Sequence, residues 1–201
     1  TEDHKAVNSP LLHLGLDIGI RRDTTALTAV YYNPDWQAYC LWGHMCWEAR
    51  KDLEGHNKDV IIQEATDKIV SLCDTASVVA LWYDEYQYIS EAQRIRKAGF
   101  GRILKPVNQQ GENTAFSNCL KGHLDDGDFL MYKDTQVLNH FKNTSVEVGE
   151  RGWRIVKRKQ THPIDLTVSI AMALYGCAQS KDYQRSSYNE NVHTRSLMSA
   201  A

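Results

Sequence analysis

The first part of the chain alternates between short apolar runs and turn-forming residues, a pattern typical of β-strands. β-Branched, aromatic and aliphatic positions predict strands at residues 12–18, 24–32 and 37–47. The segment Asn33-Pro34-Asp35 separates the last two and favours a turn. Because the connections are short, the three strands are expected to form an antiparallel meander.

Helical spacing first appears at residues 58–73, where apolar positions recur on one face. The unbroken apolar run at residues 78–83 then predicts a buried central strand. The pattern predicts seven further segments: a helix at 90–98, a strand at 102–107, a helix at 113–124, a short strand at 129–132, a short helix at 136–141, a β-hairpin at 145–148 and 153–157, and a last helix at 163–178. This order predicts an α/β fold with a mixed sheet flanked by helices and a β-hairpin before the last helix.

Length and composition indicate one globular domain. The chain has 201 residues, of which 42% are hydrophobic and 24% charged. We expect residues 1–10 to form a polar leader, 11–179 the folded domain and 180–201 a disordered tail without periodicity. No apolar run is long enough for a bilayer, so no membrane partner is expected. A net charge of −2 argues neither for nor against nucleic acid, and the five irregularly spaced cysteines are expected to be buried thiols.

Three aspartates stand in settings where a carboxylate is costly to bury. Asp17 lies inside the first apolar strand, Asp84 follows the central run, and Asp165 lies in the first turn of the last helix. Two divalent cations would remove the repulsion among them, and such a pair, about 4 Å apart, serves phosphodiester hydrolysis. Mg²⁺ and Mn²⁺ take oxygen ligands, and no Cys/His cluster has zinc spacing.

Each aspartate also has a simpler explanation. Asp17 could be a strand-end acid that faces solvent, Asp84 could serve merely to cap the following turn, and Asp165 could serve merely to interact with the helix dipole. Glu85 is an alternative ligand to Asp84, because neighbouring residues of a strand face opposite sides and only one of them should reach the metals.

Three segments together resemble the nuclease domain of bacteriophage large terminase subunits, in the ribonuclease-H-like superfamily. They are Gly15-Leu16-Asp17-Ile18-Gly19 with Arg22-Asp23-Thr24-Thr25-Ala26, then Trp82-Tyr83-Asp84-Glu85, and finally His162-Pro163-Ile164-Asp165 before an alanine-rich helix. Each is short, and their order, spacing and placement carry the resemblance, which extends over residues 11–178.

The resemblance implies a ribonuclease-H-like fold and a two-metal DNA endonuclease. Asp17, Asp84 and Asp165 would bind two Mg²⁺ or Mn²⁺ ions, with Asp23 as an accessory acid; a turn role for Asp23 is equally open. The substrate would be double-stranded viral DNA, cut from concatemers during genome packaging in the cytoplasm of the infected host cell. Implied partners are a packaging ATPase domain, a portal protein and a small terminase subunit. Since the chain has no P-loop, it would be the nuclease half alone.

Basic residues flank these segments and could hold the DNA backbone. The hairpin and its exit are the best candidates, because many like charges lie close together there. Phosphate binding by such groups would be salt-dependent and independent of sequence, whereas a solvated charged face is the commoner explanation for any single one. The candidates are Arg21, Arg22, Arg151, Arg154, Lys157, Arg158 and Lys159.

Other classes of protein share parts of this pattern. Residues 16–19 and 24–26 also look like the first phosphate loop of the actin and sugar-kinase superfamily, but the chain is short for its two domains. Junction resolvases and transposases share the same acids and differ in substrate. A catalytically silent DNA-binding or docking module is the non-enzymatic alternative, although it has no reason to keep three mutually repelling carboxylates.

Overall fold

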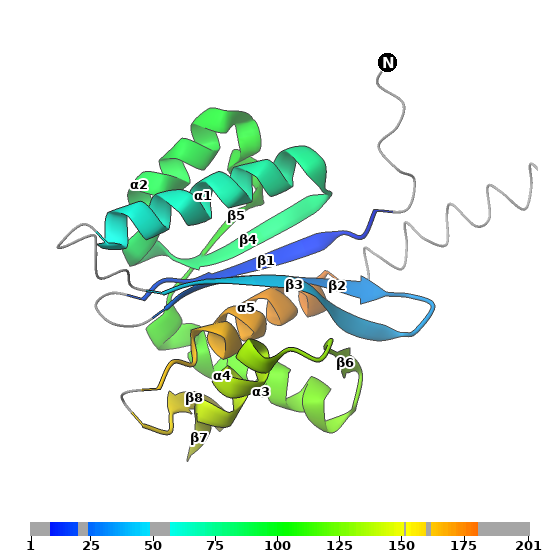
Figure 1. The fold of residues 1–201 in the computed structure, drawn as a ribbon. Helices are drawn as coiled ribbons and strands as arrows, with labels where there is room; N and C mark the ends of the chain where they lie inside the picture. The colour runs from blue at the N-terminus through cyan, green and yellow to red at the C-terminus, as the bar shows by residue number, and fades with distance from the viewer. Residues whose placement is uncertain (1–8, 20–23, 49–56, 151, 160–161, 181–201) are drawn as a thin grey trace, which may run out of the picture.

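The chain folds around one mixed six-stranded sheet (Figure 1). The computed structural model describes residues 9–19, 24–48, 57–150, 152–159 and 162–180. The strands are β1 (Leu12–Asp17), β2 (Thr25–Asn33), β3 (Ala38–Trp47), β4 (Val78–Asp84), β5 (Leu104–Val107) and β6 (Phe129–Leu130), in the order β5-β4-β1-β2-β3-β6. The meander β1-β2-β3 is antiparallel, and the pairs β1-β4, β4-β5 and β3-β6 are parallel.

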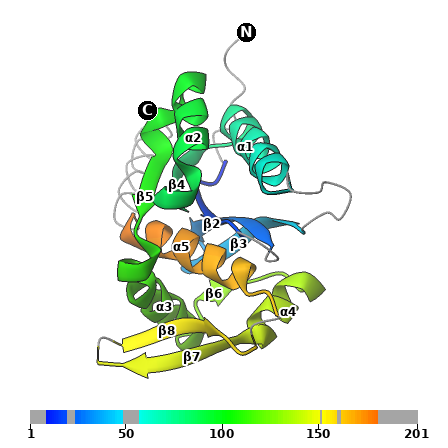
Figure 2. The ribbon, with the colours of Figure 1, turned by 90° about the vertical axis from the view of Figure 1, so that its left-hand side faces the viewer.

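Helices cover both faces of this sheet (Figures 1 and 2). One face carries α1 (Asn57–Thr75) and α2 (Glu85–Ile95), which short helical turns extend to Ile103. The other face carries α5 (Asp165–Gln179), and beyond it lie α3 (Gln109–Asp125), α4 (Thr135–Asn143) and a hairpin of β7 (Thr144–Gly149) and β8 (Gly152–Lys157). Two apolar cores result, one under α1 and α2 and one around α5. No described helix is both long and apolar enough to span a membrane.

Successive side chains of β1 point to opposite faces of the sheet, so each residue faces one of these two cores. Leu12, Leu14 and Leu16 are fully buried among α1 and α2 residues. The intervening positions therefore face α5. Among them, Gly15 lies so close to α5 that a Cβ on it would stand 2.1 Å from the carbonyl oxygen of Ser169. The absence of a side chain at Gly15 lets α5 lie directly on β1, with Asp17 two residues further on the same face.

The predicted strands, hairpin and helices are present, but three helix starts differ from the sequence expectation. The helix predicted at 90–98 begins at Glu85, because Asp84 caps it. The helix predicted at 113–124 begins four residues earlier, at Gln109, and the Asn108 side chain just before it accepts a hydrogen bond from the Gly111 amide at 3.3 Å. The last helix begins at Asp165, two residues after Pro163.

Trp36 lies in the β2–β3 turn, away from the core, with 64% of its surface exposed. All five cysteines lie in the described residues and none forms a disulfide, although only Cys40 and Cys177 are fully buried.

Candidate active site

One edge of the sheet collects the acidic residues. β1 and β4 are parallel neighbours that pair up to Leu16 and Tyr83, so Asp17 and Asp84, the next residue on each strand, end side by side at this edge. β2 begins and β3 ends at the same edge, as the pairing of Thr25 with Trp47 shows. The edge therefore carries the ends of four adjacent strands.

Asp165 reaches this edge from α5. The Thr24 hydroxyl donates a hydrogen bond to Asp165 Oδ2 at 2.5 Å, across 141 residues of chain. One helical turn later, Ser169 Oγ lies 2.8 Å from Thr28 Oγ1 and donates to the Gly15 carbonyl at 2.7 Å. These contacts align α5 with β2, so that its first turn lies over the strand ends. Asp17 and Asp165 are 9% and 5% exposed.

The thiol of Cys46 is close to both buried carboxylates. Cys46 pairs with Ala26, which in turn pairs with Asp17, so the three form one row across the sheet. Burial raises the pKa of the Cys46 thiol to about 12, and the negative charges of Asp165 and Asp17 contribute to this rise. The charges of both carboxylates therefore act on the same thiol, that of Cys46. A thiol with such a pKa stays protonated at neutral pH when no metal is bound.

Asp84 has a different environment. It is half-buried, and its Oδ1 accepts a hydrogen bond from the Tyr86 amide at 3.1 Å, which caps α2. The capping role considered from the sequence is thus present. Glu85 begins α2 and is exposed. The structure therefore places Asp17 and Asp165 where both charges act on Cys46, and Asp84 at the end of the strand next to Asp17, with one oxygen engaged in the cap.

Buried carboxylates at one sheet edge are suitable ligands for a hard divalent cation, which takes oxygen donors. Among the side chains that the structure describes, no three His, Cys, Asp or Glu residues come close enough together to hold a metal ion. The accessory acid Asp23 lies outside the described residues, as do Arg21, Arg22 and Arg151. The donor set thus fits Mg²⁺ or Mn²⁺ in chemical type, and ligation by Asp17, Asp84, Asp165 and Asp23 stays a prediction.

Sequence reasoning overlooked Glu48 and His140. Glu48 directly follows β3 at the acidic edge, and its charge acts on both Cys46 and His140. The predicted antiparallel meander could have placed Glu48 there, because β3 runs in the same direction as β1. His140 is 3% exposed on α4, and its Nδ1 accepts from the Leu166 amide at 3.1 Å. No sequence spacing indicates that contact.

The described basic candidates lie on the β7–β8 hairpin and its exit. Arg154 and Lys157 belong to β8, and Arg158 and Lys159 follow it. The hairpin rests on α3, where the Trp153 and Ile155 amides donate to Asn118 and Ser117, both at 2.9 Å. Lys157 pairs with Thr144, whose hydroxyl donates to Thr167 Oγ1 in the first turn of α5.

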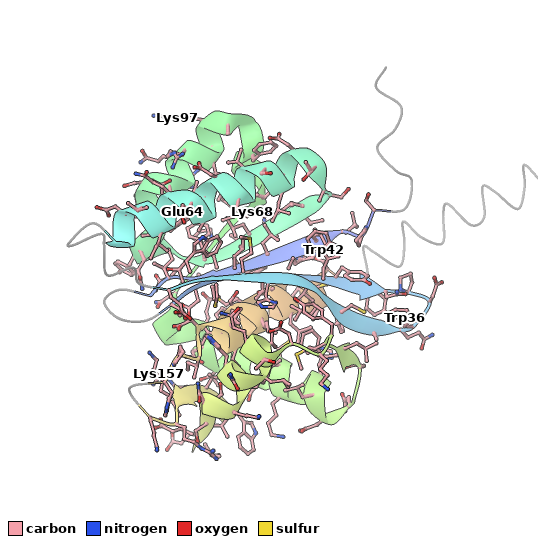
Figure 3. All side chains as sticks on the ribbon, viewed as in Figure 1. Trp36, Trp42, Glu64, Lys68, Lys97 and Lys157 are labelled. Carbon is pink, nitrogen blue, oxygen red and sulfur yellow. The ribbon has the colours of Figure 1, made fainter. Side chains whose placement is uncertain are left out.

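The basic exit of the hairpin therefore lies on the acidic side of the molecule. Figure 3 shows Lys157 at the end where β1 and β4 terminate, with Trp36 at the opposite end. Binding of DNA by Arg154, Lys157, Arg158 and Lys159 is not tested by this arrangement and stays a prediction.

The sheet order, the meander followed by parallel strands, and α5 across the acidic edge define a ribonuclease-H-like fold, which confirms the expected fold class. Among solved structures, the fold is that of large terminase nuclease domains. The HK97 bacteriophage large terminase matches with a TM-score of 0.68 at 18% identity, over 84% of this chain and 40% of that one. The nuclease of thermophilic phage G20c matches with 0.60 at 12% identity, over 82% and 81%.

The nuclease domain of bacteriophage SPP1 matches with a TM-score of 0.54 at 13% identity, over 85% of this chain and 89% of that one. The G20c nuclease has been solved with bound magnesium and the SPP1 domain with bound manganese. No protein-family model matches the chain, and no curated protein does. At these identities the likeness establishes the fold, and the chain spans 40% of the length of the HK97 protein.

Proposed function

We propose that this chain is a metal-dependent endonuclease domain that hydrolyses phosphodiester bonds of double-stranded DNA. The observation that carries the proposal is the meeting of buried Asp17 and Asp165 at the carboxyl edge of a ribonuclease-H-like sheet, with Asp84 on the next strand. Buried acids of like charge repel each other unless a cation compensates them. The fold is shared with terminase nucleases solved with magnesium or manganese.

In this proposal Asp17, Asp84 and Asp165 hold two Mg²⁺ or Mn²⁺ ions, and Asp23 assists. The ions would supply an activated water and stabilise the leaving oxygen. Thr24 fixes one oxygen of Asp165 through its hydrogen bond. Without a metal, Cys46 adds no charge beside the acids, because its raised pKa keeps the thiol protonated. The basic residues at the exit of the hairpin would hold the phosphates of the duplex.

The same likeness supports a proposal for the biological setting. We infer that the domain cuts viral DNA concatemers in the cytoplasm of an infected cell. It would act with a packaging ATPase domain, a portal protein and a small terminase subunit. The HK97 large terminase is much longer than this chain, which covers 40% of it, and that difference leaves room for a motor domain.

Metal dependence tests the proposal directly. Supercoiled plasmid should be nicked and linearised by the purified chain with Mg²⁺ or Mn²⁺, and EDTA should stop the reaction completely, because the acids alone cannot activate water. Agarose gels follow the conversion. If neither metal supports cleavage and calorimetry detects no Mn²⁺ binding, the catalytically silent DNA-binding module is favoured. The observation that supports this alternative is the hydrogen bond by which Asp84 caps α2.

Removal of two hairpin charges should weaken DNA binding in a salt-dependent way. For Arg158→Gln/Lys159→Gln, we expect a higher Kd for duplex DNA and a slope of log K against log salt that is shallower by up to about 2, since each lost phosphate contact removes about 0.9. Fluorescence anisotropy over a salt series measures this slope.

Lys68→Gln/Lys97→Gln provides a matched control with the same change in charge. Lys68 lies on α1 and Lys97 just after α2, on the opposite side of the sheet from the hairpin (Figure 3). The control slope should equal that of the wild type. Equal slopes in all three proteins would remove the hairpin exit from the DNA path.

A further inference from the structure

The first turn of α5 is a buried helix end without a cap of its own. Asp165, Leu166 and Thr167 are 5%, 0% and 1% exposed. The first amides of a helix have no partner within the helix and need an acceptor from elsewhere. The residue in the N-cap position is Ile164, whose side chain offers none. Since this turn is almost fully buried, its amides depend on acceptors from other parts of the protein.

His140 supplies one such acceptor from α4. Its Nδ1 accepts from the Leu166 amide at 3.1 Å, and the imidazole is 3% exposed. An imidazole nitrogen accepts only when it carries no proton, so this contact requires the neutral ring with its proton on Nε2. Burial lowers the pKa of His140 to about 4, which keeps the ring neutral at physiological pH. The side chain therefore caps α5 in the place of Ile164.

Side chains at the junction of α4 and β7 also bind the chain just before and just after Leu166. Asn143 Nδ2 donates to the Pro163 carbonyl at 3.2 Å, just before α5. The Thr144 hydroxyl donates to the His140 carbonyl at 2.8 Å and to Thr167 Oγ1 at 3.1 Å. Together with the His140–Leu166 contact, two of these bonds join α4 and the start of β7 to the entry of α5. Of these three contacts, the one made by His140 reaches a backbone amide of the helix.

We propose that His140 is a positioning residue for Asp165. Leu166 is the next residue after Asp165, so the cap fixes the peptide unit that carries the acid, while Thr24 holds its carboxylate from the other side. Without the cap, the first turn of α5 would fray, and Asp165 would sample positions away from Asp17. Residues that orient metal ligands typically change metal affinity 10–100-fold when they are replaced. The inference rests on the proposed metal site.

Three substitutions of His140 separate the cap from simple packing. His140→Leu removes the acceptor, His140→Asn places an oxygen near the position of Nδ1, and His140→Gln places one near Nε2 instead. We expect the Kd for Mn²⁺, from calorimetry below the unfolding temperature, to rise about tenfold or more in the Leu and Gln variants. The Asn variant should remain close to the wild type.

Hydrogen exchange provides a readout that needs no metal. The Leu166 amide should exchange faster in the Leu and Gln variants and stay protected in the Asn variant, while amides in the middle of α5 are unchanged. Thr144→Val is the matched control, because it removes side-chain hydrogen bonds from the same corner and leaves the Leu166 cap intact. It should keep the wild-type Kd and the wild-type protection of Leu166.

The outcomes distinguish the two proposals. If the wild type binds Mn²⁺, Asp165→Asn does not, and the Gln variant binds as well as the wild type, His140 does not position Asp165. If His140→Leu fails to fold, the Asn and Gln variants decide the question. If neither the wild type nor any variant binds Mn²⁺ while the exchange pattern is as expected, the cap stands and the proposed metal site is wrong.

Discussion

Asp17→Asn is expected to abolish DNA cleavage and leave the fold intact. Asp17 is 9% exposed at the end of β1, and its charge acts on the same Cys46 thiol as that of Asp165. A ligand shared by two ions contributes to activating water and to stabilising the leaving oxygen. The rate should fall by at least about 10²–10³-fold, the loss typical for one charge-stabilising group. Plasmid cleavage with Mg²⁺ and with Mn²⁺ measures it.

Although Asp17→Asn should lose cleavage, it should not lose stability. Without metal, the amide has the size of the carboxylate and removes a negative charge beside Asp165, so the unfolding free energy should be unchanged or higher. With Mn²⁺ at about 100 times its Kd, the wild type should gain about 2.7 kcal/mol, and the variant much less. Thermal unfolding in EDTA and in Mn²⁺ shows both effects.

Asp126→Asn serves as the matched control. Asp126 is exposed in the turn after α3, far along the chain from the acidic edge. The Asp126→Asn variant should cleave at the wild-type rate, and Mn²⁺ should stabilise it as much as it stabilises the wild type. If Asp17→Asn also cleaves at that rate, the acidic edge is not the active site, whatever the fold resembles.

The strands that carry the site were predictable because their signals are local. Alternation in β1 and the apolar run of β4 mark buried strands that each end at an aspartate. The crossover through α1 makes β4 run in the direction of β3 and hence of β1, the strand with which it pairs in parallel. That Asp17 and Asp84 share an edge is therefore a consequence of pattern and topology.

The position of Asp165 was predictable only by resemblance. Its decisive contact is with Thr24, 141 residues earlier, and no local spacing encodes a hydrogen bond at such separation. The same holds for His140 and Leu166, which meet because α4 and α5 pack together. The cap that Asp84 forms was foreseen as an alternative but not the resulting start of α2 at Glu85, since weak propensities leave helix ends poorly determined.

Gly15→Ala should strongly destabilise the fold. A Cβ at Gly15 would lie 2.1 Å from the Ser169 carbonyl oxygen and 3.0 Å from the Ala173 nitrogen. Both are backbone atoms of α5, so no flexible side chain can move aside and the helix itself must shift. Overpacking usually costs about 1–3 kcal/mol and occasionally more, and we expect the upper end or beyond. Urea unfolding, with m-values compared, measures the loss.

Gly43→Ala isolates the steric effect from the general effect of adding a methyl group to a strand. Gly43 lies in β3, and a Cβ there would meet nothing within 4 Å. Alanine should stabilise this position by about 0.5–1 kcal/mol, since glycine loses more conformational freedom on folding. If both variants had the same stability, α5 could not lie on β1 as described.

The displacement of α5 should also reach the acidic edge. Asp165 is one helical turn before Ser169, and Asp17 is two residues after Gly15, so a helix pushed off β1 carries one acid away from the other. In the fraction of Gly15→Ala that remains folded, Mn²⁺ should therefore bind more weakly than in Gly43→Ala. Equal Mn²⁺ affinity would mean that the helix end and its acid are held independently of this contact, by Thr24 and His140.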